Sequence, residues 1–199
     1  MNQPKIWQRR ALGILAVLLL AAGAVALYQR SYPVDPDRGN LAACVEDRYL
    51  QSRAQQTMPP FTLHEDAAVT LGNRTWMLWE VGENLDLGRV ILEESLTGRY
   101  RVTGLSYGGG NFREEIVEAD GRQYLLFGGR NTGERIASAA CTLDGTPYTL
   151  DIPAASRFLV CAEVRGETEA AHMDLESLRL YDAAGTDITE DYERTGGGI

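Results

Sequence analysis

The distribution of apolar and polar residues divides the chain into two unequal parts. Residues 11–27, ALGILAVLLLAAGAVAL, contain no charged or strongly polar side chain. As a helix, this segment together with Tyr28 would extend roughly 27 Å, close to the hydrocarbon thickness of a bilayer. Beyond residue 60 the apolar residues recur in short runs instead. The pattern therefore predicts one membrane-spanning helix followed by a β-rich domain.

The short runs have the character of strands. RTWMLWEV, at residues 74–81, is apolar at consecutive positions and would be buried on both faces, with Trp76 and Trp79 packed on opposite sides. Asp120-Gly121 and Asp144-Gly145 separate later runs and are strong hairpin signals. Short strands at regular spacing predict a mainly β fold, either an antiparallel β-sandwich or a partly open barrel.

One short amphipathic helix is expected between the two parts. Residues 31–40, SYPVDPDRGN, are typical of a linker. Asn40 can then N-cap a helix over residues 41–57, which Met58-Pro59-Pro60 would end. Its apolar face would hold Leu41, Val45 and Tyr49.

We therefore predict four segments. They are a cytoplasmic tip and transmembrane anchor (1–30), a linker and short helix (31–60), an extracytoplasmic β-rich domain (61–192) and a flexible tail (193–199).

The flanking residues predict the orientation of the anchor. Lys5, Arg9 and Arg10 precede the apolar run, and basic residues stay on the cytoplasmic side. The expected location is the cell membrane, with a single pass, the N-terminus in the cytoplasm and residues 31–199 outside. A secreted protein is the alternative, because residues 22–24 and 24–26 both fit a signal-peptidase site. We favour a retained anchor, since the apolar run is longer than the usual core of a signal peptide.

Residues 41–44, Leu-Ala-Ala-Cys, match the lipobox of bacterial lipoproteins. Lipidation requires the cysteine at the end of the apolar run. Here a polar segment that includes Arg30, Asp35, Asp37 and Arg38 intervenes, and it cannot lie in hydrocarbon. We therefore expect Cys44 to lie in the short helix without a lipid.

Charge narrows the choice of partners. No acidic residue precedes Ser31, so residues 31–199 carry all 28 acidic and 15 of the 19 basic side chains, a net charge of −13. Such a surface disfavours nucleic acid and electrostatic attraction to anionic headgroups. The expected partners are the lipid bilayer, through residues 11–27, and either an envelope protein or a wall component.

One motif resembles a catalytic site. Gly104-Leu105-Ser106-Tyr107-Gly108 fits the G-x-S-x-G nucleophile elbow, and His172 follows it along the chain. An elbow requires a helix after the serine, whereas Gly109, Gly110 and another β-like run follow here. We expect Ser106 at a strand end beside a glycine turn. A serine hydrolase that uses Ser106 and His172 is the alternative.

No metal ion or cofactor is predicted. His64-Glu65 begins like H-E-x-x-H, but Ala68 replaces the second histidine, and the chain has two histidines in all. The glycine-rich segment 128–133 lacks the G-K-[ST] ending of a phosphate loop. The acidic residues near the C-terminus do not have EF-hand spacing; they are Asp182, Asp187, Glu190 and Asp191.

The three cysteines leave two readings open. Cys141 and Cys161 lie in two β-like runs separated by a third, so they could form a disulfide between two sheets. Three free buried thiols are the alternative. No C-x-x-C motif is present, which gives a thiol-redox function little support.

These patterns favour a non-enzymatic, membrane-tethered module for envelope binding, sensing or an accessory role, with an unknown ligand. The surface serine hydrolase remains the alternative function.

Overall fold

The computed structural model describes residues 3–53 and 57–193 and confirms the mainly β fold. The helices are α1 (Gln3–Arg30), α2 (Leu41–Arg53) and α3 (Thr189–Glu193). The strands are β1 (Phe61–Leu71), β2 (Arg74–Val81), β3 (Asp86–Glu94), β4 (Tyr100–Gly108), β5 (Phe112–Ala119), β6 (Arg122–Arg130), β7 (Ser138–Leu143), β8 (Thr146–Asp151), β9 (Arg157–Glu163) and β10 (Asp174–Tyr181). A 3₁₀ turn, η1 (Thr132–Glu134), lies between β6 and β7. Of the predicted tail, residues 194–199 fall outside the described residues.

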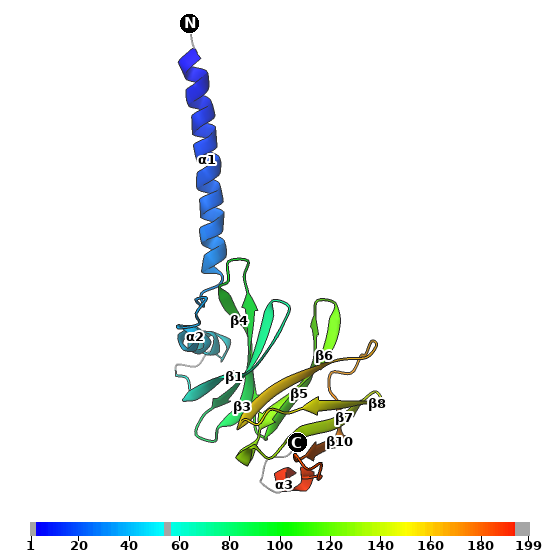
Figure 1. Ribbon diagram of the computed structural model, residues 1–199. Helices are drawn as coiled ribbons and strands as arrows, with labels where there is room; N and C mark the ends of the chain where they lie inside the picture. The colour runs from blue at the N-terminus through cyan, green and yellow to red at the C-terminus, as the bar shows by residue number, and fades with distance from the viewer. Residues whose placement is uncertain (1–2, 54–56, 194–199) are drawn as a thin grey trace.

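Helix α1 projects away from the β-domain (Figure 1). It is 28 residues long, and its segment Arg10–Arg30 has a mean hydropathy of 2.5, with none of that segment buried in the protein. By length and composition this helix can cross a membrane. The predicted apolar helix is therefore present. Its leucine side chains are exposed and not covered by the β-domain, and a large exposed apolar surface of this kind marks an interaction site.

Residues 31–40 pack against the β-domain, which the linker prediction did not anticipate. Val34 and Tyr32 are buried, and Val34 forms an isolated antiparallel bridge with Tyr100 of β4. The Asn40 side chain accepts a hydrogen bond from the Asp35 N–H and donates one to the Pro33 carbonyl oxygen. Asn40 therefore organises the turn that precedes α2.

Helix α2 presents the predicted apolar face. Leu41, Val45 and Tyr49 are buried against the four-stranded sheet. The helix ends at Arg53, and residues 54–56, within the predicted span, lie outside the described residues. Cys44 is half-buried in the second turn of α2 and packs on the same apolar cluster.

The strands form three antiparallel sheets. β1, β2, β3 and β4 pair in chain order as a meander, whereas the other two sheets have the orders β5-β6-β9 and β10-β7-β8. β9 therefore pairs with β6 across the intervening β7 and β8. Both Asp-Gly hairpins are confirmed: Ala119 pairs with Arg122 and Leu143 with Thr146.

Three apolar clusters join these sheets in layers. The first lies between α2 and the four-stranded sheet and contains Met77 and Trp79; the second joins the other face of that sheet, through Trp76 and Leu78, to the β5-β6-β9 sheet. The third joins the β5-β6-β9 sheet to the β10-β7-β8 sheet. β2 is therefore buried on both faces, as its sequence predicts, and the β5-β6-β9 sheet lies between two others.

Candidate functional site

A buried carboxylate lies where the four-stranded sheet meets the β5-β6-β9 sheet. Along β2, Glu80 follows Trp76 and Leu78 on the same face, because strand residues two apart share a face. That face packs on β6 and β9, so Glu80 is carried into the interior and its side chain is 3% exposed. A carboxylate so enclosed requires compensating hydrogen bonds.

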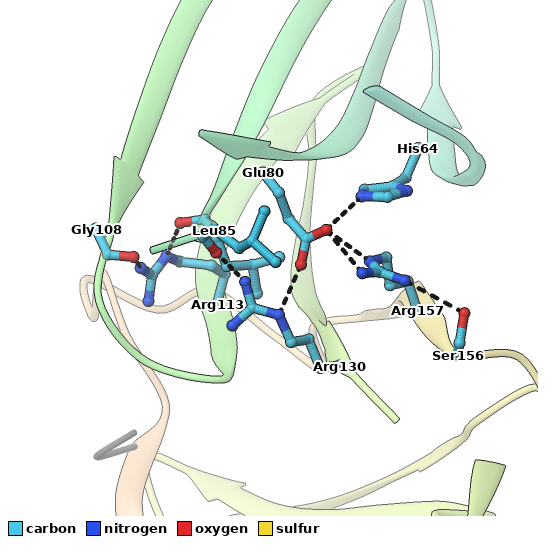
Figure 2. Close-up of polar contacts among 9 residues, drawn as sticks. His64, Glu80, Leu85, Gly108, Arg113, Arg130, Ser156 and Arg157 are labelled. Atoms are coloured by element: carbon cyan, nitrogen blue, oxygen red, sulfur yellow. Dashed lines mark hydrogen bonds and ion pairs between the residues drawn. The ribbon is translucent and has the colours of Figure 1, made fainter. Parts of the chain in front are cut away.

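Three side chains from three other strands supply these bonds (Figure 2). Arg130 Nε lies 2.7 Å from Glu80 Oε1, and Arg157 Nη2 lies 2.8 Å from Oε2. His64 Nε2 lies 3.0 Å from the same Oε2. Arg130 ends β6 and pairs in register with Arg157, which begins β9, so the ladder places both guanidinium groups at one carboxylate.

The electrostatic balance keeps Glu80 ionised. Burial alone raises the pKa of Glu80, but the hydrogen bonds from Arg157, Arg130 and His64 outweigh it, and the net pKa lies below the usual 4.5. A carboxylate with a lowered pKa and three donors is a poor proton acceptor. The Glu80 cluster therefore ties two sheets together and is not suited to general-base chemistry.

Next to this cluster, Arg113 fixes the turn between β4 and β5. Its Nε donates to the Leu87 carbonyl oxygen at 3.0 Å, and its Nη2 donates to the carbonyl oxygens of Gly108 and Gly109, the latter at 2.7 Å. Burial, followed by the nearby charge of Arg130, lowers the pKa of Arg113. The glycine turn after Ser106 is thus held by a side chain from the following strand (Figure 2).

A cavity of about 440 Å³ opens beside Arg113. Its walls come from β3, β4, β5 and β6 and from the loop that leads into β10. The lining residues are Arg89, Ser106, Tyr107, Gly108, Gly109, Phe112, Arg113, Glu114, Phe127, His172, Met173 and Leu175. Aromatic and aliphatic walls with a few converging polar groups are typical of a small-ligand site.

The two candidate catalytic residues, Ser106 and His172, line this same cavity. Ser106 lies near the end of β4, and its carbonyl oxygen accepts a hydrogen bond of 2.8 Å from Trp79 Nε1. Among the described residues, no hydrogen bond joins Ser106 to His172. Strand β5 follows Ser106 after the glycine turn, where an elbow would have a helix.

His172 has a carboxylate partner that the sequence did not suggest. His172 Nδ1 and Glu114 Oε1 are 2.8 Å apart, while the other Glu114 oxygen accepts the Met173 N–H. The histidine side chain is 66% exposed and the glutamate 11%. A carboxylate that holds a histidine by Nδ1 is the arrangement that orients the base in hydrolase triads.

One of the residues that line the cavity, Arg89, belongs to a largely buried ion pair. Arg89 Nη1 of β3 lies 2.7 Å from Glu115 Oε1 of β5, with both side chains largely buried. Burial lowers the pKa of Arg89 and raises that of Glu115. Within the described part of the chain, Arg89 Nε and Nη1 have no well-aligned hydrogen-bond acceptor. Arg89 therefore lines the cavity with its charge balanced by Glu115, while its Nε and Nη1 atoms are buried away from the opening.

The cysteines lie on opposite sides of the central sheet. Cys141 packs in the cluster between the β5-β6-β9 and β10-β7-β8 sheets, whereas Cys161 packs on the cluster beneath the four-stranded sheet. Both are free thiols, as is Cys44, so the hypothetical Cys141–Cys161 disulfide is not formed. Burial raises the pKa of Cys141 to about 11, which disfavours the reactive thiolate.

The residues that the sequence reasoning missed are charged groups from distant strands: Glu80, Arg130, Arg157 and Glu114. Glu80 alone had a local signal, as an acidic residue that follows Trp76 and Leu78 on the same face of β2. Across the described residues, no three His, Cys, Asp or Glu side chains lie close enough together to hold a metal ion.

The chain matches no protein-family model, no curated protein and no solved structure.

Proposed function

We propose that this protein is a single-pass membrane protein of the bacterial cell envelope. In this proposal residues 31–199 form an extracytoplasmic, non-enzymatic module for binding, sensing or an accessory role. Helix α1 carries the proposal, because its apolar segment is of bilayer length and none of it is buried in the β-domain. The basic residues before the apolar run support a cytoplasmic N-terminus.

The cavity beside Arg113 is the ligand site that this function requires. Phe112, Phe127 and Met173 provide apolar contact, and Arg89 and Arg113 line the same cavity as basic residues. The ligand class that best fits these walls is a small molecule or a side chain with an apolar body and a hydrogen-bond acceptor. An envelope protein or a wall component can each present such a group.

Protease accessibility tests the topology. Protease added to intact spheroplasts should digest residues 31–199 and spare a tag fused to the N-terminus, because the bilayer shields only the cytoplasmic side. Recovery of the β-domain in the medium, with a new N-terminus near Leu27, would establish a cleaved signal peptide and refute the anchor. The Cys44→Ser variant serves as a control and should stay membrane-bound, since Cys44 is a residue of α2 that packs on the apolar cluster beneath this helix.

A serine hydrolase is the second candidate, favoured by the shared cavity of Ser106 and His172 and by the His172–Glu114 hydrogen bond. Small acyl esters are the test substrates. We expect no hydrolysis, or hydrolysis that Ser106→Ala leaves unchanged. Activity lost in both Ser106→Ala and His172→Gln, but kept in the exposed control Ser52→Ala, would establish the hydrolase instead.

A further inference from the structure

The loop between β3 and β4, residues 95–99, carries the most exposed leucine of the described domain. Leu96 is 98% exposed, and its neighbours Ser95, Thr97 and Gly98 carry no charge. A leucine held at a loop tip, away from every other side chain, contributes nothing to the core. A single exposed leucine needs no explanation by itself, so its role depends on what lies beside the loop.

This loop lies at the membrane-facing end of the molecule. The Leu96 N–H donates a hydrogen bond of 3.1 Å to the hydroxyl of Tyr28, which follows directly after the apolar run of α1. Figure 1 shows the loop above β4 beside the C-terminal end of α1. Tyrosine after an apolar helix lies in the headgroup layer of a bilayer. The loop tip therefore lies at that depth.

The loop cannot swing away from the helix, because the chain between them is fastened to β4. Arg99 Nε donates to the Tyr32 carbonyl oxygen at 2.8 Å, and Arg99 Nη2 lies 2.9 Å from Asp35 Oδ1. Val34 and Tyr100 exchange backbone hydrogen bonds of 2.9 and 3.0 Å. The ring centroids of Tyr28 and Tyr32 lie 5.1 Å apart, which continues the contact onto the helix.

The backbone of the loop is also prepared for a medium poor in water. Every N–H from Ser95 to Arg99 donates a hydrogen bond. The acceptors are the carbonyl oxygens of Arg99 and Ser95 and the hydroxyl groups of Ser95 and Tyr28. Unpaired N–H and C=O groups both exclude loops from hydrocarbon; this loop has paired its N–H groups, which suits it to the headgroup boundary.

We propose that the β3–β4 loop docks on the bilayer that α1 spans and places Leu96 at the boundary between headgroups and acyl chains. The proposal rests on the membrane-anchored function above. Because α1 already holds the loop at the surface, forming the contact loses little translational entropy. A single apolar side chain is therefore sufficient. The contact is apolar, so it does not depend on anionic lipid, which the acidic domain would repel.

Tryptophan fluorescence in vesicles tests this docking. The full chain carrying Trp7→Phe is reconstituted into phosphatidylcholine vesicles whose acyl chains are brominated near the ester end. Leu96→Trp adds a fluorophore at the loop to the buried Trp76 and Trp79, whose own signal is measured in the Trp7→Phe parent. Leu85→Trp is the matched control, because Leu85 is 49% exposed and precedes the opposite end of β3. β3 is 9 residues long, so the two probes are separated by about 30 Å.

We expect bromine to quench the Leu96→Trp protein several-fold more strongly than the Leu85→Trp protein. Bromine placed near the methyl end should quench it less, because the docking is shallow. Equal quenching of the two variants, in protein that still floats with the vesicles, would overturn the docking while leaving the anchor intact. Protein that fails to float with the vesicles would overturn the anchored function itself, and the docking with it.

Discussion

Glu80 is the residue on which the junction of the two sheets depends most. Among the residues that the structure describes, it is the one carboxylate within hydrogen-bond reach of both Arg130 and Arg157, and its Oε2 also lies 3.0 Å from His64 Nε2. Removing one partner of a buried ion pair lowers stability by more than the pair contributes in net terms, because the remaining charges stay buried without compensation. The loss should therefore be visible in the stability of the whole domain.

Glu80→Gln should lower the free energy of unfolding by about 3 kcal/mol at neutral pH, as expected for breaking a buried ion pair. Urea denaturation followed by tryptophan fluorescence measures this difference. Glu163→Gln is the matched control, because its partner Arg122 and Glu163 itself are both more than half exposed. Such a surface pair should contribute less than about 1 kcal/mol. Equal losses in the two variants would contradict the role assigned to Glu80.

The difference in unfolding free energy between the native protein and Glu80→Gln should depend on pH. Because the pKa of Glu80 is lowered in the folded state, its contribution is fully present above the ordinary value of 4.5 and disappears as the pH falls through the lower folded value. The stability gap between the native protein and Glu80→Gln should therefore be constant near neutrality and close in acid. A gap that widened below pH 4.5 would require a different origin.

For single residues, the sequence predicts the environment of a side chain only where that environment follows from adjacent positions in the chain. The burial of Trp76 and Trp79 on opposite faces followed from the alternation within β2, and it is confirmed. The His172–Glu114 contact could not be inferred, because 58 residues separate the two and only folding brings the loop before β10 against β5, where the Ile116 N–H donates to the Ala171 carbonyl oxygen.

Among the elements, the two Asp-Gly hairpins were the most predictable. Asp120 and Gly121 have φ of 51° and 71°, and Asp144 and Gly145 have φ of 51° and 73°. Positive φ at both central residues defines the type I′ turn that suits two-residue hairpins. The hairpin geometry is local, so two letters of sequence were enough to predict it.

Gly145→Val should destabilise the protein by about 1 kcal/mol or more, because a β-branched residue is strained at positive φ. A side chain at Gly145 would meet no atom within 4 Å, so backbone strain alone is measured. Gly109→Val is the control, since Gly109 has equally open surroundings but no positive φ. Thermal unfolding of both variants should separate them; a loss at Gly109 as large as that at Gly145 would refute the turn argument.

Strand pairing was less predictable than strand position. The apolar runs marked the strands because period-two patterning is local, but nothing in the runs shows that β6 pairs with β9 and not with β7. The packed segment 31–40 was missed for a related reason. Its prolines and glycine are typical of a linker, whereas its attachment to β4 depends on Val34 meeting Tyr100 across 66 positions.

For the whole molecule, the sequence predicted a mainly β fold, either an antiparallel β-sandwich or a partly open barrel, and the structure has three antiparallel sheets in a sandwich-like arrangement. The middle sheet contains β6, in which Leu125, Leu126 and Phe127 are all fully buried. Three consecutive buried residues require apolar neighbours on both faces of a strand, as in the middle of a stack. The run RQYLLFGG has this continuous character, so burial of both faces of β6 could be predicted from it. Which sheets cover the two faces could not.

The pairing of β6 with β9 also sets the order in which this chain can fold. The β1–β4 meander closes through neighbouring strands, at low contact order, as soon as residue 108 has been made. The β5-β6-β9 sheet, by contrast, must wait for the chain beyond β8. Until β9 arrives, the edge of β6 is unpaired and the face of the first sheet that holds Trp76 and Leu78 lacks part of its cover. During N-to-C synthesis we therefore expect the β6 edge to stay unpaired while about thirty more residues are made, a few seconds at ordinary translation rates.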